Sequence, residues 1–80
     1  MRSVIRSSQS LGNSLREHRI AAGLTQQELG RRTKLRQATI SNLEQGEGGT
    51  LRSLFAVVRE LKLEIRLDPR SVAPSLDEIF

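Results

Sequence analysis

The sequence predicts a mainly α-helical fold of four short helices followed by one C-terminal β-strand. Apolar residues recur at helical spacing through most of residues 11–61. Serine, threonine and glycine stand where helices begin and end. Residues 62–68 instead alternate strictly between apolar and charged, which is typical of a strand. Eighty residues allow one domain, whose core is marginal without help from a partner chain.

The first helix is expected from Leu11 to about Ala22. Ser10 is a suitable N-cap for it, and Gly23 a suitable C-terminal stop. Leu11 and Leu15 share one face of this helix, so that face is expected to be buried. The residues before the helix, 1–9, show no sustained period, and we expect a disordered N-terminal arm there.

Two short helices joined by a tight turn are expected next. The first opens at Thr25, which can form a capping box with Glu28. The second starts near Gln37 and buries Ile40 and Leu43, three residues apart on one face. Leu29 faces inward and Leu35 fills the turn. This layout is that of a DNA-reading helix-turn-helix motif.

The second helix of the pair leaves a small, neutral, hydrogen-bonding face. With Ile40 at the centre of the buried side and steps of about 100° per residue, the outward side chains are those of Gln37, Ala38, Ser41 and Asn42. Gln and Asn can bridge two atoms of an adenine edge, Ser can bond several bases, and an Ala methyl can contact thymine. The alternative is an ordinary solvated face of a helical bundle. The capped helix, short turn and basic surroundings favour DNA.

Positive charge is concentrated in the half of the chain that contains this motif. Residues 1–43 hold eight Arg or Lys against two acidic residues, whereas residues 44–80 hold five against seven. Taken singly, each basic residue is an ordinary surface charge; as a cluster they indicate phosphate contacts, which position a protein on DNA. The candidates are Arg2, Arg6, Arg31, Arg32, Lys34 and Arg36.

The segment resembles the Xre/Cro-like helix-turn-helix family. The matching residues are Gly23, Leu24, Thr25, Gln26, Glu28, Leu29, Gln37, Ile40, Ser41, Leu43, Glu44 and Gly46. The resemblance implies a compact helical fold with Gln26 on a phosphate, and with Gln37, Ala38, Ser41 and Asn42 facing bases. It also implies a structural ion pair between Arg19 and Glu44.

Two positions depart from the family pattern. Gly30 stands where a small residue is usual in the middle of the first helix of the pair, and Lys34 stands where the turn often has glycine. A residue other than glycine is uncommon at positive φ, so the turn is expected to be distorted or slightly strained.

A fourth helix follows the loop GEGG at 46–49. Thr50 is its expected cap, and an apolar face recurs at helical spacing. We expect this face to be core and to hold Leu51, Leu54, Phe55, Val58 and Leu61.

The run KLEIRLD at 62–68 is expected to be a strand that pairs across a homodimer. Leu63, Ile65 and Leu67 lie on one side, and Pro69 ends the run. Nothing else in the chain pairs with it, so the simplest partner is the same strand of a second copy, antiparallel across a two-fold axis. Such a dimer places two reading helices in successive major grooves and predicts a palindromic operator. The alternative is that the fourth helix continues through this segment.

The last stretch, 69–80, is expected to be a short flexible C-terminal tail. Two open interpretations are plain disorder and a segment that orders on a partner through Leu76, Ile79 and Phe80.

Within the family, the chain resembles the HipB-type antitoxins. The resemblance covers residues 10 to about 68 and is carried by QATISNLEQ, TLRSLFAVVREL and LEIRL. It implies a DNA-binding antitoxin that represses its own toxin-antitoxin operon and binds a HipA-like serine/threonine kinase toxin. The alternative is a solitary Xre-like transcription regulator. The expected domains are 1–9 (arm), 10–61 (helix-turn-helix domain), 62–68 (dimerising strand) and 69–80 (tail).

Other classes of function have little support in the sequence. No nucleophile-base pair, carboxylate dyad or phosphate-binding glycine loop suggests an enzyme. With no cysteine and one histidine, we expect no metal or cofactor. No apolar run approaches a membrane span and no signal peptide is evident, so we expect a cytoplasmic protein.

Overall fold

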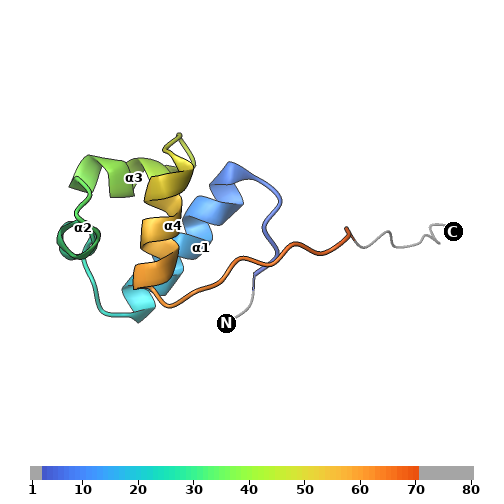
Figure 1. Ribbon diagram of the computed structural model, residues 1–80, viewed down its shortest axis with the longest axis horizontal. Helices are drawn as coiled ribbons and strands as arrows, with labels where there is room; N and C mark the ends of the chain where they lie inside the picture. The colour runs from blue at the N-terminus through green and yellow to red at the C-terminus, as the bar shows by residue number, and fades with distance from the viewer. Residues whose placement is uncertain (1–2, 71–80) are drawn as a thin grey trace, which may run out of the picture.

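The computed structural model describes residues 3–70, and these form four helices. The helices are α1 (Ser8–Ala21), α2 (Gln26–Thr33), α3 (Gln37–Gln45) and α4 (Leu51–Glu60). In Figure 1, α2 and α3 lie at one end of the molecule, α1 and α4 lie next to them, and the C-terminal segment runs out towards the opposite end. The predicted compact, mainly α-helical fold is confirmed.

Helix α1 begins earlier than the sequence analysis expected. Ser7, not Ser10, is the N-cap: the Ser7 hydroxyl accepts a hydrogen bond from the Ser10 amide at 3.0 Å. In return, the Ser10 hydroxyl accepts one from the Ser7 amide at 3.1 Å. The two serines stand three residues apart, so the earlier one can cap while the later one completes the box. The placement of the cap at Ser10 was therefore wrong by one turn.

The core receives apolar side chains from all four helices. Its buried members are Leu15, Leu29, Ile40, Val57 and Val58. Leucines from the helices and their connections pack around them, namely Leu11, Leu24, Leu35, Leu43, Leu54, Leu61 and Leu63. The expected inward positions in the first three helices are thus confirmed, including Leu35 in the turn.

The buried face of α4 differs from the expected one. Leu51 is 73% exposed and Phe55 is 48% exposed, so placing these two residues in the core was wrong. The buried stripe is centred on Leu54, Val57 and Val58, and Phe55 lies about 100° round the helix from Leu54. Leu51 is the first residue of α4.

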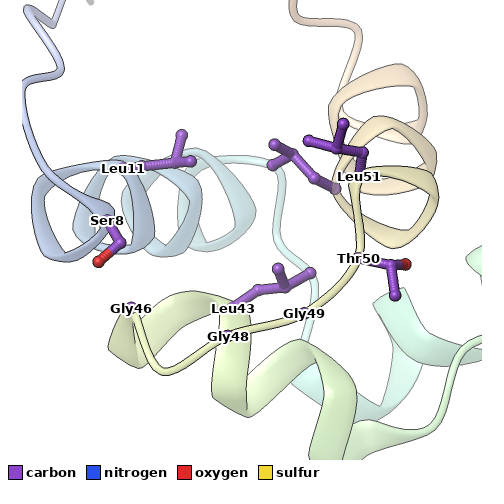
Figure 2. A pocket seen from close by; sticks show the side chains of 9 residues that line it. Ser8, Leu11, Leu43, Gly46, Gly48, Gly49, Thr50 and Leu51 are labelled. Carbon is purple, nitrogen blue, oxygen red and sulfur yellow. The ribbon is translucent and has the colours of Figure 1, made fainter.

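Figure 2 shows where Leu51 lies. It stands at the edge of an open apolar groove between the N-terminal ends of α1 and α4, beside Leu11, Leu43 and the glycine loop. The groove has a volume of about 240 Å³, which is below the roughly 300–1,000 Å³ of typical small-molecule pockets. We therefore assign it no ligand.

Helices α1 and α3 approach each other closely at two glycines. A Cβ atom on Gly12 would lie 2.5 Å from the carbonyl oxygens of Leu43 and Glu44. Gly46, at φ 73°, ends α3, and a Cβ there would lie 2.8 Å from the backbone of Gln9. Because backbone meets backbone at both points, α1 fixes the position of α3. No pattern in the sequence singles out Gly12 for this role.

The fourth helix does not continue through the charged segment. It ends at Glu60, Lys62 adopts φ 59°, and the Leu63 amide closes the turn on the Val58 carbonyl at 2.9 Å. The alternative of a continued helix is therefore excluded. Among the described residues no strand is assigned, and the predicted pairing of 62–68 with a second copy remains a prediction.

The expected partner-binding residues of the tail, Leu76, Ile79 and Phe80, lie outside the described residues. Within residues 3–70, no helix is both long and apolar enough to span a membrane.

Candidate nucleic-acid interface

Helix α2 begins with the capping box expected from the sequence. The Thr25 hydroxyl accepts from the Glu28 amide at 3.0 Å, and the Glu28 carboxylate accepts from the Thr25 amide at 2.8 Å. Interaction of the carboxylate with the Thr25 amide, and secondarily with the Thr25 hydroxyl, favours the charged form and lowers the pKa of Glu28 below its usual value. A charged carboxylate at this end also complements the helix dipole. The start of α2 is thus fixed at Thr25.

The turn between α2 and α3 is held by backbone contacts. Lys34 adopts the left-handed conformation, φ 61° and ψ 33°, which confirms that a lysine occupies the position where glycine is favoured. The Leu35 amide donates to the Gly30 carbonyl at 2.8 Å. A Cβ atom on Gly30 would lie 2.7 Å from the Leu35 carbonyl oxygen. A residue without a side chain at Gly30 therefore allows the turn to fold back on α2 and orient α3.

The outer face of α3 is the one predicted from the sequence. Ile40 is buried, whereas Gln37, Ala38 and Asn42 are exposed. Ser41 is half-buried, and its hydroxyl accepts from the Gln45 side-chain amide at 3.4 Å. The four expected base-facing residues therefore lie on the solvent side of a helix that is rigidly attached to α1 and α2. Their contact with bases remains a prediction.

The ion pair that the family resemblance implied is present and buried. Arg19 Nε donates to Glu44 Oε2 at 2.6 Å, and Arg19 Nη2 donates to Glu44 Oε1 at 3.1 Å. The whole residues are 8% and 5% exposed. Arg19 Nη1 also donates to the Leu24 carbonyl at 2.8 Å. The pair therefore connects α1, the loop before α2, and α3.

Gln26 has a second role that sequence reasoning missed. Its side-chain Nε2 donates to Glu44 Oε1 at 3.0 Å, so this amide extends the buried ion pair to the first residue of α2. The hydrogen bond orients the amide while leaving a further N–H and the oxygen free for other partners. The predicted phosphate contact of Gln26 is compatible with this geometry and remains a prediction.

The basic residues around α2 and α3 are exposed. Arg31, Lys34 and Arg36 have exposed side chains, as phosphate contacts require. Arg32 differs, because its Nη1 lies 3.5 Å from Glu60 Oε2 on α4. Its pairing to Glu60 reduces the charge it offers to DNA. The Arg36 side chain does not cap α3. Arg2, a further candidate, lies outside the described residues.

The described part of the chain offers no candidate metal site. Residues 3–70 contain no cluster of three His, Cys, Asp or Glu side chains placed to hold a metal ion.

A capped helix, a tight turn and a second helix with an exposed polar face define a helix-turn-helix domain. Residues 10–63 match the family described as helix-turn-helix domain. Antitoxin HipB of Escherichia coli (strain K12) is 34% identical over 70 residues, which cover 85% of this chain and 80% of HipB.

Solved structures show the same relationship. The HipB chain of the HipB-O4 20mer complex superposes with a TM-score of 0.80 at 32% identity, covering 88% of this chain and 100% of that chain. For the HipA-HipB-O2-O3 complex the TM-score is 0.79, with the same sequence identity and the same coverage of both chains. For the restriction-modification controller protein C.AhdI from Aeromonas hydrophila the TM-score is 0.66 at 28% identity. The match covers 71% of this chain and 88% of that chain. This chain belongs to the Xre-like helix-turn-helix family, in its HipB-type branch.

Proposed function

We propose that this protein is a sequence-specific DNA-binding antitoxin that represses its own toxin-antitoxin operon and binds a HipA-like kinase toxin. The observation that carries the proposal is the exposed polar face of α3 on a helix that backbone contacts hold in place. The similarity to HipB over most of both chains supports the antitoxin part.

The proposed base-reading face is formed by Gln37, Ala38, Ser41 and Asn42. Gln37 is the first residue of α3, so its side chain projects beyond the helix end that enters the major groove. Asn42 lies further along the same side and is exposed. Both side chains can make bidentate hydrogen bonds to adenine.

Phosphate contacts position this face on the duplex. Arg31, Lys34 and Arg36 are exposed beside α3, and Gln26 and Arg32 complete the proposed set. Arg32 exchanges its contact with Glu60 for one with a phosphate, which costs little because exposed ion pairs contribute only about 0–1 kcal/mol.

A homodimer through residues 62–68 completes the proposed repressor. In Figure 1 the C-terminal segment lies at the end of the molecule away from α2 and α3, so pairing there leaves both reading faces free. Two reading helices separated by about 34 Å would contact successive major grooves of a palindromic operator.

Substitutions on α3 test base reading. On DNA from upstream of the protein's own gene, Gln37→Ala or Asn42→Ala should weaken binding by about 1–3 kcal/mol, with random duplex hardly affected. Arg31→Ala is the matched control, because loss of a phosphate contact should weaken both duplexes alike and reduce the salt dependence. Fluorescence anisotropy at several salt concentrations measures both effects. Equal losses on the two duplexes for Gln37→Ala would remove the base-reading assignment.

The toxin partner is tested by recovery of the protein from its native host. Antitoxin function requires a kinase to co-purify, whereas a solitary transcription regulator recovers none. We propose that Leu76, Ile79 and Phe80 contact the kinase, since a few apolar anchors usually dominate an interface. Truncation after Pro69 and Phe80→Ala should then weaken kinase binding and leave DNA binding by the free protein intact. Unchanged kinase binding by the truncated chain would place the contact on the helical body.

A further inference from the structure

The segment after α4 has a charged side and an apolar side. Arg66 Nε donates to Glu64 Oε2 at 2.8 Å, and both side chains are largely exposed. Two residues that are two apart and touch lie on the same side of an extended chain. The residue between them, Ile65, is 45% exposed, and Leu67 is 94% exposed. An exposed apolar side of this kind indicates a surface that contacts another apolar surface.

A groove lies beside this apolar side. It lies between the N-terminal segment and the C-terminal segment alongside α1, and its apolar lining includes Val4, Ile5, Leu11, Leu15 and Val58. In Figure 1 the two terminal segments cross at this side of α1. An apolar side chain brought in by a second chain can therefore reach the groove.

The charges of the segment are self-complementary in one antiparallel register. When two copies pair with Ile65 opposite Ile65, Glu64 of each copy faces Arg66 of the other, and Leu63 faces Leu67. Opposite residues in antiparallel strands share a side and stand about 4.5–5.5 Å apart between Cβ atoms. The two-fold axis repeats both contacts, which gives two cross-strand ion pairs and one continuous apolar side.

Neighbouring registers are unfavourable. Centring the pair on Glu64 places that carboxylate opposite itself, and centring it on Arg66 places that guanidinium opposite itself. Like charges directly opposite each other destabilise a sheet. A shift of one residue places leucines opposite charged side chains.

Larger shifts are disfavoured by the backbone. A register in which Leu63 faces Leu63 of the second copy requires pairing by residues of α4 and by Lys62, whose backbone is left-handed. A centre at Leu67 sets Pro69, which has no N–H, opposite Ile65. The register centred on Ile65 is thus the one that charge, sidedness and backbone all allow.

We infer that two copies of this chain pair as antiparallel strands about Ile65, and that Glu64 and Arg66 set this register and select a second copy as partner. The inference rests on the proposed homodimer and specifies its interface. Leu67 of the second copy lies beside Leu63, at the opening of the groove. The ion pair seen within one chain becomes part of a four-charge network across the two-fold axis.

Charge reversal tests the register without disturbing the helical body, because both side chains are exposed. Glu64→Arg alone creates two Arg–Arg contacts per dimer, and Arg66→Glu alone creates two Glu–Glu contacts. Each should raise the dimer dissociation constant at least about tenfold in sedimentation equilibrium. The double variant Glu64→Arg/Arg66→Glu is self-complementary again and should dimerise like the wild type. An equimolar mixture of the two single variants should form heterodimers, which native mass spectrometry resolves from homodimers.

Arg52→Glu is the matched control, because it makes the same charge change at an exposed position on α4 and should leave dimerisation unchanged. Circular dichroism verifies that each variant is folded. A wild-type chain that stays monomeric at all concentrations would overturn the homodimer itself. A dimeric wild type whose single variants dimerise equally well, with statistical mixing, would overturn the register while leaving the dimer in place.

Discussion

At the scale of single residues, the buried Arg19–Glu44 pair is the most consequential contact. Glu44 accepts hydrogen bonds from both Arg19 and Gln26, so one carboxylate connects α1, α2 and α3. The contact is bidentate on the Arg19 side, which is the strong geometry for this pair. A buried ion pair adds little net stability compared with apolar residues, but removal of one partner leaves a buried, uncompensated charge. The pair therefore ties the position of α3 to its neighbours.

Replacement of Glu44 tests this conclusion. Glu44→Gln leaves the Arg19 guanidinium buried without a counter-charge and should lower the free energy of unfolding by about 3–5 kcal/mol. In a domain of this size, the melting temperature should fall by about 10 °C or more at fixed protein concentration. Glu47→Gln, an exposed position in the following loop, is the control and should change little. A melting temperature for Glu44→Gln equal to that of the control would refute the structural role.

At the scale of the elements, the backbone of the α2–α3 turn is strained. Lys34 is held at φ 61°, where a residue with a Cβ is disfavoured by roughly 1–2 kcal/mol. The turn persists because the Leu35 amide is bonded to Gly30 and Leu35 packs on the core. The basic side chain at this position is one of the proposed phosphate contacts. The strained backbone at Lys34 thus coincides with a positive charge on the proposed DNA-binding surface.

Two substitutions at Lys34 separate the backbone effect from the charge effect. Lys34→Gly and Lys34→Ala both remove the ammonium group, but only glycine adopts positive φ without strain. The glycine variant should be more stable than the alanine variant by about 1 kcal/mol in urea denaturation. Both should bind DNA more weakly than the wild type, because both lose the same positive charge. Equal stabilities would mean that the turn carries no strain at this position.

The cap of α2 should make stability depend on pH. The pKa of Glu28 is lowered in the folded state from its ordinary 4.5, so the unfolded chain binds more protons as the pH falls. The stabilisation from the charged carboxylate is present above the unfolded pKa and is lost as the pH falls through the folded pKa.

Comparison of the wild type with Glu28→Gln isolates this contribution, since all other acids titrate in both proteins. The difference in urea midpoint should be constant near neutral pH and should shrink below the ordinary pKa of 4.5. A difference that stays constant down to pH 3 would show that Glu28 does not titrate in the cap.

At the scale of the whole molecule, the proposed functions lie at opposite ends. The exposed polar face and the basic residues belong to α2, α3 and their turn, and the charged segment leaves α4 in the other direction (Figure 1). Residues 3–70 form a small core with five buried apolar residues, which is consistent with a domain that gains stability from association. The proposed pairing at the far end would add buried apolar area without covering the exposed polar face of α3.

Substitution of Ile65 tests the dimer at this scale. Ile65→Asp places two carboxylates opposite each other at the proposed two-fold axis and should abolish dimerisation and cooperative operator binding. Leu51→Asp makes the same chemical change at an exposed apolar position on α4 and is the control. Analytical ultracentrifugation and DNA titration measure both properties. An Ile65→Asp protein that still sediments as a dimer would contradict the proposed interface.

The sequence by itself determined the local elements and the direction of the exposed polar face of α3. Thr25 and Glu28 stand at the spacing of a capping box, and the 3.6-residue period around Ile40 places Gln37 and Asn42 outward; both are local properties that need no distant contact. The buried face of α4 was decided by the tertiary structure. Leu51 and Phe55 fit the period as well as Val57 does, and only packing against the other helices selects among them.

Tertiary structure also decided the contacts that join distant positions. The carboxylate of Glu44 receives the amide of Gln26, and the backbone of α3 lies against Gly12, because helix packing brings these positions together. No spacing in the sequence encodes either contact. The same holds for the ion pair between Arg32 and Glu60, which depends on how α2 and α4 lie side by side. Local periodicity specifies which side of a helix is buried, and packing specifies what that side meets.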